Sequence, residues 1–168
     1  MDISRKYLLD ANIFIEAKNR YYSFEIAEGF WEWLALLADE QSFLTIKEVR
    51  EEIINSYQDD QLVAWLKAFP LKQFIDTDLE IQANQRKIAN YVLNHEIFSP
   101  ENKYRFLEKA DPWLIATAMT RGYTVVTHES KVGVGTKKVK IPNICEVFGV
   151  DYTNLFEVMK AKKVKLKL

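Results

Sequence analysis

Cysteine is nearly absent from this sequence, in which Cys145 is the only one among 168 residues. A single cysteine excludes an internal disulfide framework and a zinc site rich in cysteine. Histidine is also scarce, with two residues in the chain. We therefore expect a protein of the reducing cytoplasm, in which any metal site relies on carboxylate oxygens rather than on sulfur or imidazole ligands.

Glycine and proline are few as well, at five and four residues. The chain contains no repeat, no low-complexity segment and no linker rich in glycine, serine or proline. Apolar residues make up 48% of it, a composition that argues against disorder. Because a chain of this length fits one domain with a sizeable core, we predict a single domain over residues 1–168.

Long hydrophobic runs and an excess of one charge are both missing. The apolar run near the N-terminus is too short for a signal peptide, and no stretch approaches the length of a membrane span. We therefore expect no membrane association. The net charge of −1 gives no global basic signature of nucleic-acid binding, but it leaves room for a local basic patch.

Short apolar segments alternate along the chain with segments of helical periodicity, while residues 96–107 fit neither pattern. Strands are predicted over residues 6–9, 41–46, 123–127 and 139–141, with an edge strand in the tail over residues 163–168. Helices are predicted over residues 23–38, 46–57, 59–68, 78–95, 112–121, 142–148 and 154–161. This alternation predicts an α/β sandwich with a mainly parallel sheet.

Acidic side chains stand at the ends of these elements. Asp10 ends the strand over residues 6–9, Glu129 follows the strand over residues 123–127, and Asp111 begins the helix before that strand. Ligands bind at the carboxyl ends of parallel strands, so the three carboxylates should converge at one edge of the sheet. Mg²⁺ and Mn²⁺ prefer such ligands, and a pair of these ions can promote phosphodiester cleavage by water.

A fourth acidic candidate lies on the helix predicted over residues 46–57, which carries Glu48, Glu51 and Glu52. At about 100° per residue, the apolar stripe of this helix passes through Val49. Glu48 and Glu51 point away from the stripe, whereas Glu52 flanks it and can reach a half-buried cleft. Glu52 is therefore the candidate we select.

Each of these acidic residues also has an ordinary structural interpretation. Asp10 can cap the helix that follows it, and Asp111 can cap the helix that starts at Pro112. Glu52 alone would be a solvated helix residue, and Glu129 alone a polar loop residue. It is the conjunction of the four that favours a metal site.

The segments LLDAN, VREEI, ADPWLIATA and VVTHE follow one another in the chain. Their order resembles that of the PIN-domain nucleases, which include the VapC-type toxins. That family carries Asp-x-Asn or Asp-x-Ser after the first strand, Val-x-x-Glu on a helix, then Asp-x-x-Ile-x-Ala-x-Ala, then Thr-x-Asp after a strand. The resemblance covers roughly residues 6–150 and leaves a C-terminal helix and a basic tail over residues 151–168.

The chain is also similar to a PIN-like subgroup whose members carry AKNRYYxF, GFWxWL, VTHE and IPNxC. These motifs correspond here to Ala17–Phe24, Gly29–Leu34, Val126–Glu129 and Ile141–Cys145.

The resemblance implies a three-layer α/β/α PIN-like fold and a metal-dependent endoribonuclease that cleaves single-stranded RNA. It implies one or two Mg²⁺ or Mn²⁺ ions as cofactors, held by Asp10, Glu52, Asp111 and Glu129. Asn12 and Thr127 would orient carboxylates or a phosphate. One departure is Glu129, where most of the wider family has Asp, so a second ion would bind there through water or weakly. The resemblance further implies a toxin, with a cognate antitoxin as partner and a homodimeric assembly.

Residues beside the predicted metal site suggest contacts with RNA. His128 can shuttle a proton or touch a phosphate, or it is an ordinary loop histidine. Lys18, Arg20, Tyr21 and Tyr22 combine cations with aromatic rings, which suits the phosphates and stacked bases of single-stranded RNA but also a charged surface turn. The lysines of the tail fit either an RNA backbone contact or a solvated edge.

Three alternative functions were weighed against the ribonuclease. A non-catalytic PIN-like module that binds RNA or protein stays open because of Glu129. A structure-specific DNA nuclease ranks lower, since the sequence holds no helical arch or helix–hairpin–helix to grip DNA. A phosphotransferase with an Asp nucleophile is disfavoured, because it would want a second acid at Asn12.

Overall fold

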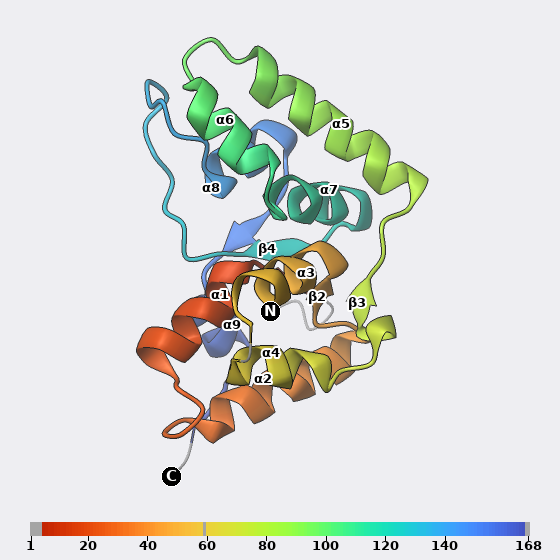
Figure 1. Ribbon diagram of the computed structural model, residues 1–168, viewed down its shortest axis with the longest axis vertical. Coiled ribbons are helices and arrows are strands. Elements are labelled where there is room, and N and C mark those ends of the chain that lie inside the picture. Colours follow the sequence, from red (N-terminus) through yellow and green to blue (C-terminus); the bar gives the residue numbers. More distant parts are fainter. Residues whose placement is uncertain (1–4, 59, 167–168) are drawn as a thin grey trace.

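Two short parallel sheets lie in the middle of the computed structural model, which describes residues 5–58 and 60–166 (Figure 1). The central sheet, in the order β1-β4-β5, consists of β1 (Tyr7–Leu9), β4 (Thr124–Val126) and β5 (Tyr152–Thr153). The other sheet pairs β2 (Thr45–Ile46) with β3 (Phe74–Ile75). All of these pairings are parallel, which confirms the predicted sheet type.

Helices cover both faces of the central sheet (Figure 1). One side carries α5 (Leu79–Asn94), α6 (Pro100–Leu107), α7 (Asp111–Arg121) and α8 (Ile141–Phe148). The other side carries α1 (Ala11–Glu16), the π-helix η1 (Ala17–Tyr21), α2 (Glu28–Gln41), α3 (Lys47–Ser56), α4 (Gln61–Lys67) and α9 (Leu155–Ala161). The predicted α/β class is therefore confirmed, and the arrangement is compatible with three α/β/α layers. Across residues 5–58 and 60–166, no helix is both long and apolar enough to span a membrane.

The register of the central sheet sets the position of the candidate site. Leu9 lies opposite Val126, and both strands are buried along their whole length. Strands buried on both faces read as continuous apolar runs, which is why the sequence predicted them. Because β1 and β4 are parallel and in this register, the residues that follow them, Asp10 and Thr127, leave the sheet at the same edge.

The aromatic segment after η1 packs into the core. Phe30 and Trp31 of α2 are buried. Tyr22 stacks on Phe30 with ring centroids 4.2 Å apart, and Phe24 stacks on Trp31 at 4.0 Å. Such aromatic pairs bury large apolar areas, so most of the rings near the N-terminus stabilise the fold rather than face a ligand.

Two helices end at a glycine, whereas the helix predicted over residues 23–38 is displaced to α2, Glu28–Gln41. α7 ends at Gly122 and α8 at Gly149, whose φ angles of 68° and 66° lie in the left-handed region that glycine adopts without strain. Residues 96–107, which fit neither sequence pattern, contain α6, because Ser99 accepts a capping hydrogen bond and Pro100 opens the helix.

Some predicted elements are wrong. The strand predicted over residues 139–141 does not form, because the Ile141 amide donates to the Glu129 carboxylate at 2.8 Å and Ile141 begins α8 instead. Residues 163–166 of the tail form no strand, and residues 167–168 lie outside the described part. The strand predicted over residues 41–46 shrinks to the two residues of β2.

Candidate functional site

Asp10 stands at the carboxyl edge of the central sheet and is only 3% exposed. Its main-chain amide donates to the Val126 carbonyl at 3.0 Å, which continues the β1–β4 pairing by one residue. The Thr127 hydroxyl donates to Asp10 Oδ2 at 2.9 Å. Asp10 occupies the N-cap position of α1, but its side chain makes no capping hydrogen bond, so capping does not explain its burial.

Thr127 and Asn12 fix the loop after β4 against the start of α1. The Thr127 hydroxyl accepts from Asn12 Nδ2 at 3.3 Å and from the Glu129 amide at 3.1 Å, so its single proton is left for Asp10. Asn12 Oδ1 accepts from the His128 amide at 3.2 Å. These bonds hold one face of the Asp10 carboxylate in a defined orientation.

Asp111 is the first residue of α7, and Ala110 occupies the N-cap position. The capping role predicted for Asp111 is therefore wrong, because Asp111 already lies inside the helix. Pro112 is the second helical residue rather than the first. With no capping task, the half-buried Asp111 carboxylate is available to the site beside Asp10.

Glu52 is the acid of α3 that turns toward this region. Its Oε2 accepts from the amide of Ala110 at 2.8 Å, immediately before Asp111. The other two acids of α3 have other partners: Glu51 pairs with Arg50, and Glu48 accepts from the Thr77 hydroxyl. Glu52 is thus the glutamate of α3 that reaches the start of α7, in agreement with its selection from the helical spacing.

Glu129 is held by two donors from the start of α8. Its Oε1 pairs with Lys140 Nζ at 2.9 Å, and its Oε2 accepts from the Ile141 amide at 2.8 Å. Each carboxylate oxygen keeps a further lone pair. In this orientation Glu129 ties the loop after β4 to α8, a role that sequence reasoning did not anticipate.

The four carboxylates act on one another electrostatically. Burial raises the pKa of Asp10 to about 7; the hydrogen bond from Thr127 opposes this shift, and the charges of Glu129 and Glu52 add to it. Burial also raises the pKa of Asp111 well above its usual range, and the charges of the other three carboxylates raise it further. Like charges gathered in a partly buried site oppose ionisation, so this edge of the sheet favours a proton or a cation.

The carboxylates do not close around a common point, however. Within residues 5–58 and 60–166, no group of three or more His, Cys, Asp or Glu side chains is arranged to hold a metal ion. The hydrogen bonds above give the reason, since Glu52 turns to the Ala110 amide and Glu129 to Lys140. The structure brings the four predicted residues into one electrostatic neighbourhood but not into a finished ligand shell.

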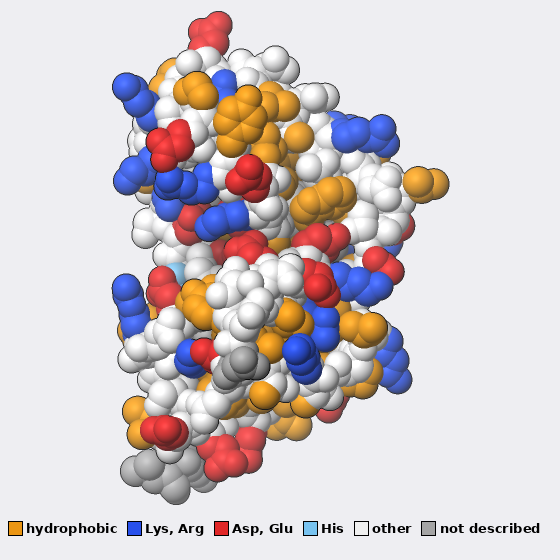
Figure 2. Space-filling view, in the orientation of Figure 1, with side chains coloured by type: hydrophobic (Ala, Val, Ile, Leu, Met, Phe, Trp, Pro, Cys, Tyr) orange, Lys and Arg blue, Asp and Glu red, His pale blue; other side chains and the backbone are white. Residues whose placement is uncertain are grey.

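A pocket of about 300 Å³ opens beside Asp111 and Glu129. Its walls are basic and polar and include Asn102, Arg105, Lys109, Lys138 and Lys140. Figure 2 shows Lys and Arg side chains gathered over the half of the molecule that holds α6, next to acidic side chains near its middle. A pocket lined by both acids and cations suits an anionic ligand whose charge is shared with a metal. No local sequence pattern indicated this pocket, because its cations come from separate segments.

The four residues predicted to contact RNA divide into two pairs. Lys18 forms an ion pair with Asp60 and Tyr22 stacks on Phe30, so both are engaged within the fold. Arg20 and Tyr21 are exposed.

His128 lies between Thr127 and Glu129 in the chain, and its ring lies beside that of Tyr21. Its ring is half-buried, and burial lowers the pKa of the imidazole, which keeps it neutral at physiological pH. Its ring neighbours are Tyr21 and Phe156, the latter a residue that the sequence did not suggest.

Residues 7–166 match the family model described as "Domain of unknown function (DUF4411)". The chain belongs to the DUF4411 family. No curated protein and no solved structure gives a significant match. The DUF4411 match spans both sheets and all four acidic residues, so the whole candidate site lies inside the family domain. The function of this DUF4411 domain has to be argued from the chemistry of the site.

Proposed function

We propose that this DUF4411 protein is a metal-dependent endoribonuclease that cleaves single-stranded RNA, as its resemblance to the PIN-domain nucleases implies. The observation that carries the proposal is Asp10, a buried carboxylate whose pKa is raised to about 7 among three other acids. Strongly perturbed carboxylates at the carboxyl edge of a parallel sheet are typical of functional sites.

The donor set fits Mg²⁺ or Mn²⁺. It consists of carboxylate oxygens, which these hard ions prefer, and the mutual repulsion of the acids is relieved by a cation. Asp10 and Asp111 would hold an ion directly, and Glu52 and Glu129 would join them by turning from their present partners or through water. When bound, one or two such ions neutralise charge on the phosphate and activate water.

The residues of the chain would position the RNA around this centre. Thr127 holds the Asp10 carboxylate in place, and Asn12 holds Thr127. Lys109, Lys138 and Arg105 would bind phosphates of the strand at the rim of the adjacent pocket. The proposed biological role, a toxin inhibited by a cognate antitoxin and assembled as a homodimer, rests on the resemblance.

A second candidate is a non-catalytic PIN-like module that binds RNA or protein. One observation favours it: both oxygens of Glu129 are engaged by Lys140 and by the Ile141 amide, so this acid has a structural task. A DNA nuclease remains the lower-ranked enzyme alternative.

Cleavage assays with the purified protein test the proposal. We expect a labelled single-stranded RNA to be cut in Mn²⁺ or Mg²⁺ and to stay intact in excess EDTA. An unlabelled single-stranded RNA should compete for cleavage better than a flapped DNA of the same length. Intact RNA under all metal conditions would favour the binding module, and preferential cutting of the flap would favour the DNA nuclease.

A further inference from the structure

Three aromatic rings from distant segments meet beside the carboxylates. Tyr21 ends η1, His128 follows β4, and Phe156 lies in the first turn of α9. Each pair of rings has its centroids 6.0 Å apart, at interplanar angles of 45°, 51° and 85°. None of the pairs is stacked face to face: Tyr21 and Phe156 meet edge to face, and His128 is tilted against both.

Two of these rings are exposed. Tyr21 is 47% exposed and Phe156 is 43% exposed. Two other aromatic residues near Tyr21 in the sequence pack against the core: Tyr22 stacks on Phe30, and Phe24 stacks on Trp31. Part of each of the Tyr21 and Phe156 side chains is therefore open to a ligand.

His128 joins this aromatic group to the candidate metal site. It lies between Thr127, which bonds Asp10, and Glu129. Its amide is fixed by Asn12, and within the described residues its Nε2 atom is buried without a hydrogen-bond partner. The loop that orients the carboxylates thus also presents the third ring.

We propose that Tyr21, His128 and Phe156 form a platform on which one unpaired nucleobase of the RNA stacks next to the cleavage site. This inference deepens the proposed function and rests on it. Every base offers a flat π-face, and stacking on exposed aromatic side chains is how single strands are gripped without base pairing. A base inside a duplex is already stacked on both sides, so the platform selects single-stranded substrate.

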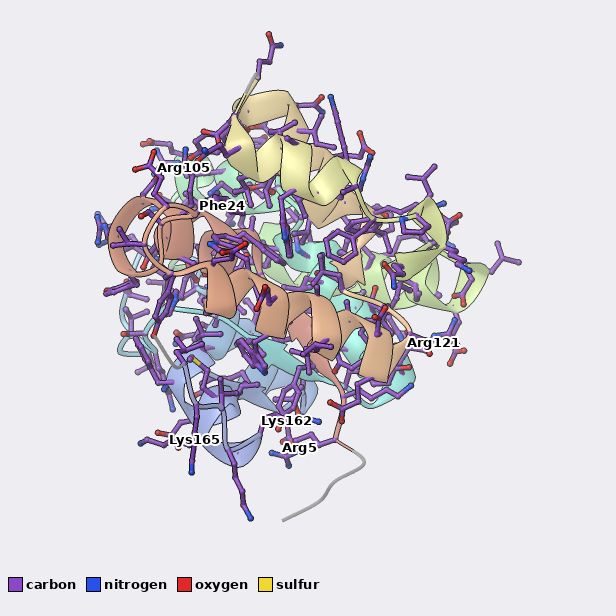
Figure 3. The ribbon with its side chains drawn as sticks, turned by 90° about the horizontal axis from the view of Figure 1, so that it is seen from below. Arg5, Phe24, Arg105, Arg121, Lys162 and Lys165 are labelled. Atoms are coloured by element: carbon purple, nitrogen blue, oxygen red, sulfur yellow. The ribbon has the colours of Figure 1, made fainter. Side chains whose placement is uncertain are left out.

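Charge supports a nucleic acid over an apolar protein partner on this surface. The exposed Arg20 precedes Tyr21. Lys160 follows Phe156 by one turn of α9, but it pairs with Glu157 at 2.9 Å. A phosphate next to the stacked base would meet Arg20. Figure 3 shows Lys162 beside Arg5 at one edge of the molecule, with Lys165 farther along the same side. Lys162 pairs with Glu40 and Arg5 pairs with Asp151.

Binding of short RNA oligonucleotides tests the platform apart from cleavage. The full chain carrying Asp10→Asn is titrated with a single-stranded oligouridine and with versions that have one abasic position each, followed by fluorescence anisotropy. Phe156→Leu keeps apolar volume and removes the ring, whereas Phe156→Tyr keeps the ring. We expect Phe156→Leu and Tyr21→Ala to weaken binding about 10-fold, and Phe156→Tyr to leave it unchanged.

The abasic series decides whether a base is the partner of the rings. At one position, loss of the base should weaken binding to the parent protein and should have no further effect in Phe156→Leu or Tyr21→Ala. Tyr104→Ala removes a comparably exposed ring, 61% exposed on α6, and should bind every oligonucleotide like the parent. Lys138→Ala should weaken binding equally with and without the base.

Two results overturn the platform: unchanged RNA binding by Phe156→Leu, or no abasic position that couples to either ring. Tighter binding of a duplex than of the single strand also contradicts it. If the wild-type chain fails to cleave RNA while the coupling is present, the nuclease proposal fails and the platform stands. If cleavage occurs without the coupling, the nuclease stands and the platform fails.

Discussion

Asp10→Asn should lower the rate of RNA cleavage by about 100-fold or more while leaving the fold intact. Asparagine has the shape of aspartate, and its carbonyl oxygen can still accept the hydrogen bond from Thr127. The substitution removes the negative charge and places an NH2 group where one carboxylate oxygen stood, so the site loses a ligand for a divalent cation. Single-turnover cleavage in Mn²⁺ measures the effect, and circular dichroism checks the fold.

The glutamates of α3 provide a matched control for this experiment. Glu52→Gln should also slow cleavage, because Glu52 faces the start of α7 through the Ala110 amide. Glu51→Gln alters the preceding residue of the same helix. Glu51 is exposed and paired with Arg50, so this variant should cleave like the wild type. Wild-type rates in Asp10→Asn, or equal losses in Glu52→Gln and Glu51→Gln, would contradict the assigned site.

The stability of the metal-free protein should fall as the pH rises from about 4 to about 7. The pKa of Asp10 is about 7 in the folded protein against an ordinary value of 3.8, so in this window the folded state binds more protons than the unfolded state. The free energy of unfolding then decreases with increasing pH. Asp111, whose pKa is also raised, acts in the same direction.

The expected loss is on the order of 2–4 kcal/mol for Asp10 between those pH limits. Paired surface acids whose pKa values are lowered, such as Asp60 and Asp78, give the opposite trend at low pH and are present in every variant. The informative quantity is therefore the difference between wild type and Asp10→Asn, measured by urea unfolding in EDTA. Asp10→Asn should be the more stable protein at pH 8 and should lose most of this difference at pH 4.

Divalent cations should restore the stability that the metal-free protein loses at high pH. At pH 8, Mn²⁺ at about 100 times its dissociation constant should raise the free energy of unfolding of the wild type by about 2.7 kcal/mol, because it binds the folded state. The same Mn²⁺ concentration should have a much smaller effect on Asp10→Asn. If the free energy of unfolding of the two proteins in EDTA has the same pH dependence, the fold does not raise the pKa of Asp10.

Much of the site was predictable because it follows from local pattern and a single topological rule. The continuous apolar run before Asp10 predicted β1, and the run before Thr127 predicted β4. Parallel pairing then required both residues to leave the sheet at one edge. Helical spacing was enough to choose Glu52 over Glu51.

The parts that were missed depend on contacts between distant residues. β3 and β5 are two-residue strands with no periodicity of their own, formed because neighbouring strands supply their partners. The strand predicted over residues 139–141 failed because Glu129 takes the Ile141 amide. No sequence pattern links Phe156 to Tyr21, since α9 and η1 meet only in the folded chain.

Crystals of the protein soaked in Mn²⁺, with anomalous scattering recorded at the manganese edge, test the central claim most directly. The account predicts at least one Mn²⁺ ion bound by the carboxylates of Asp10 and Asp111, with Glu52 or Glu129 turned toward it or joined to it through water. An anomalous map that is empty between Asp10 and Asp111 at saturating Mn²⁺, or that shows Mn²⁺ only elsewhere on the molecule, would contradict it.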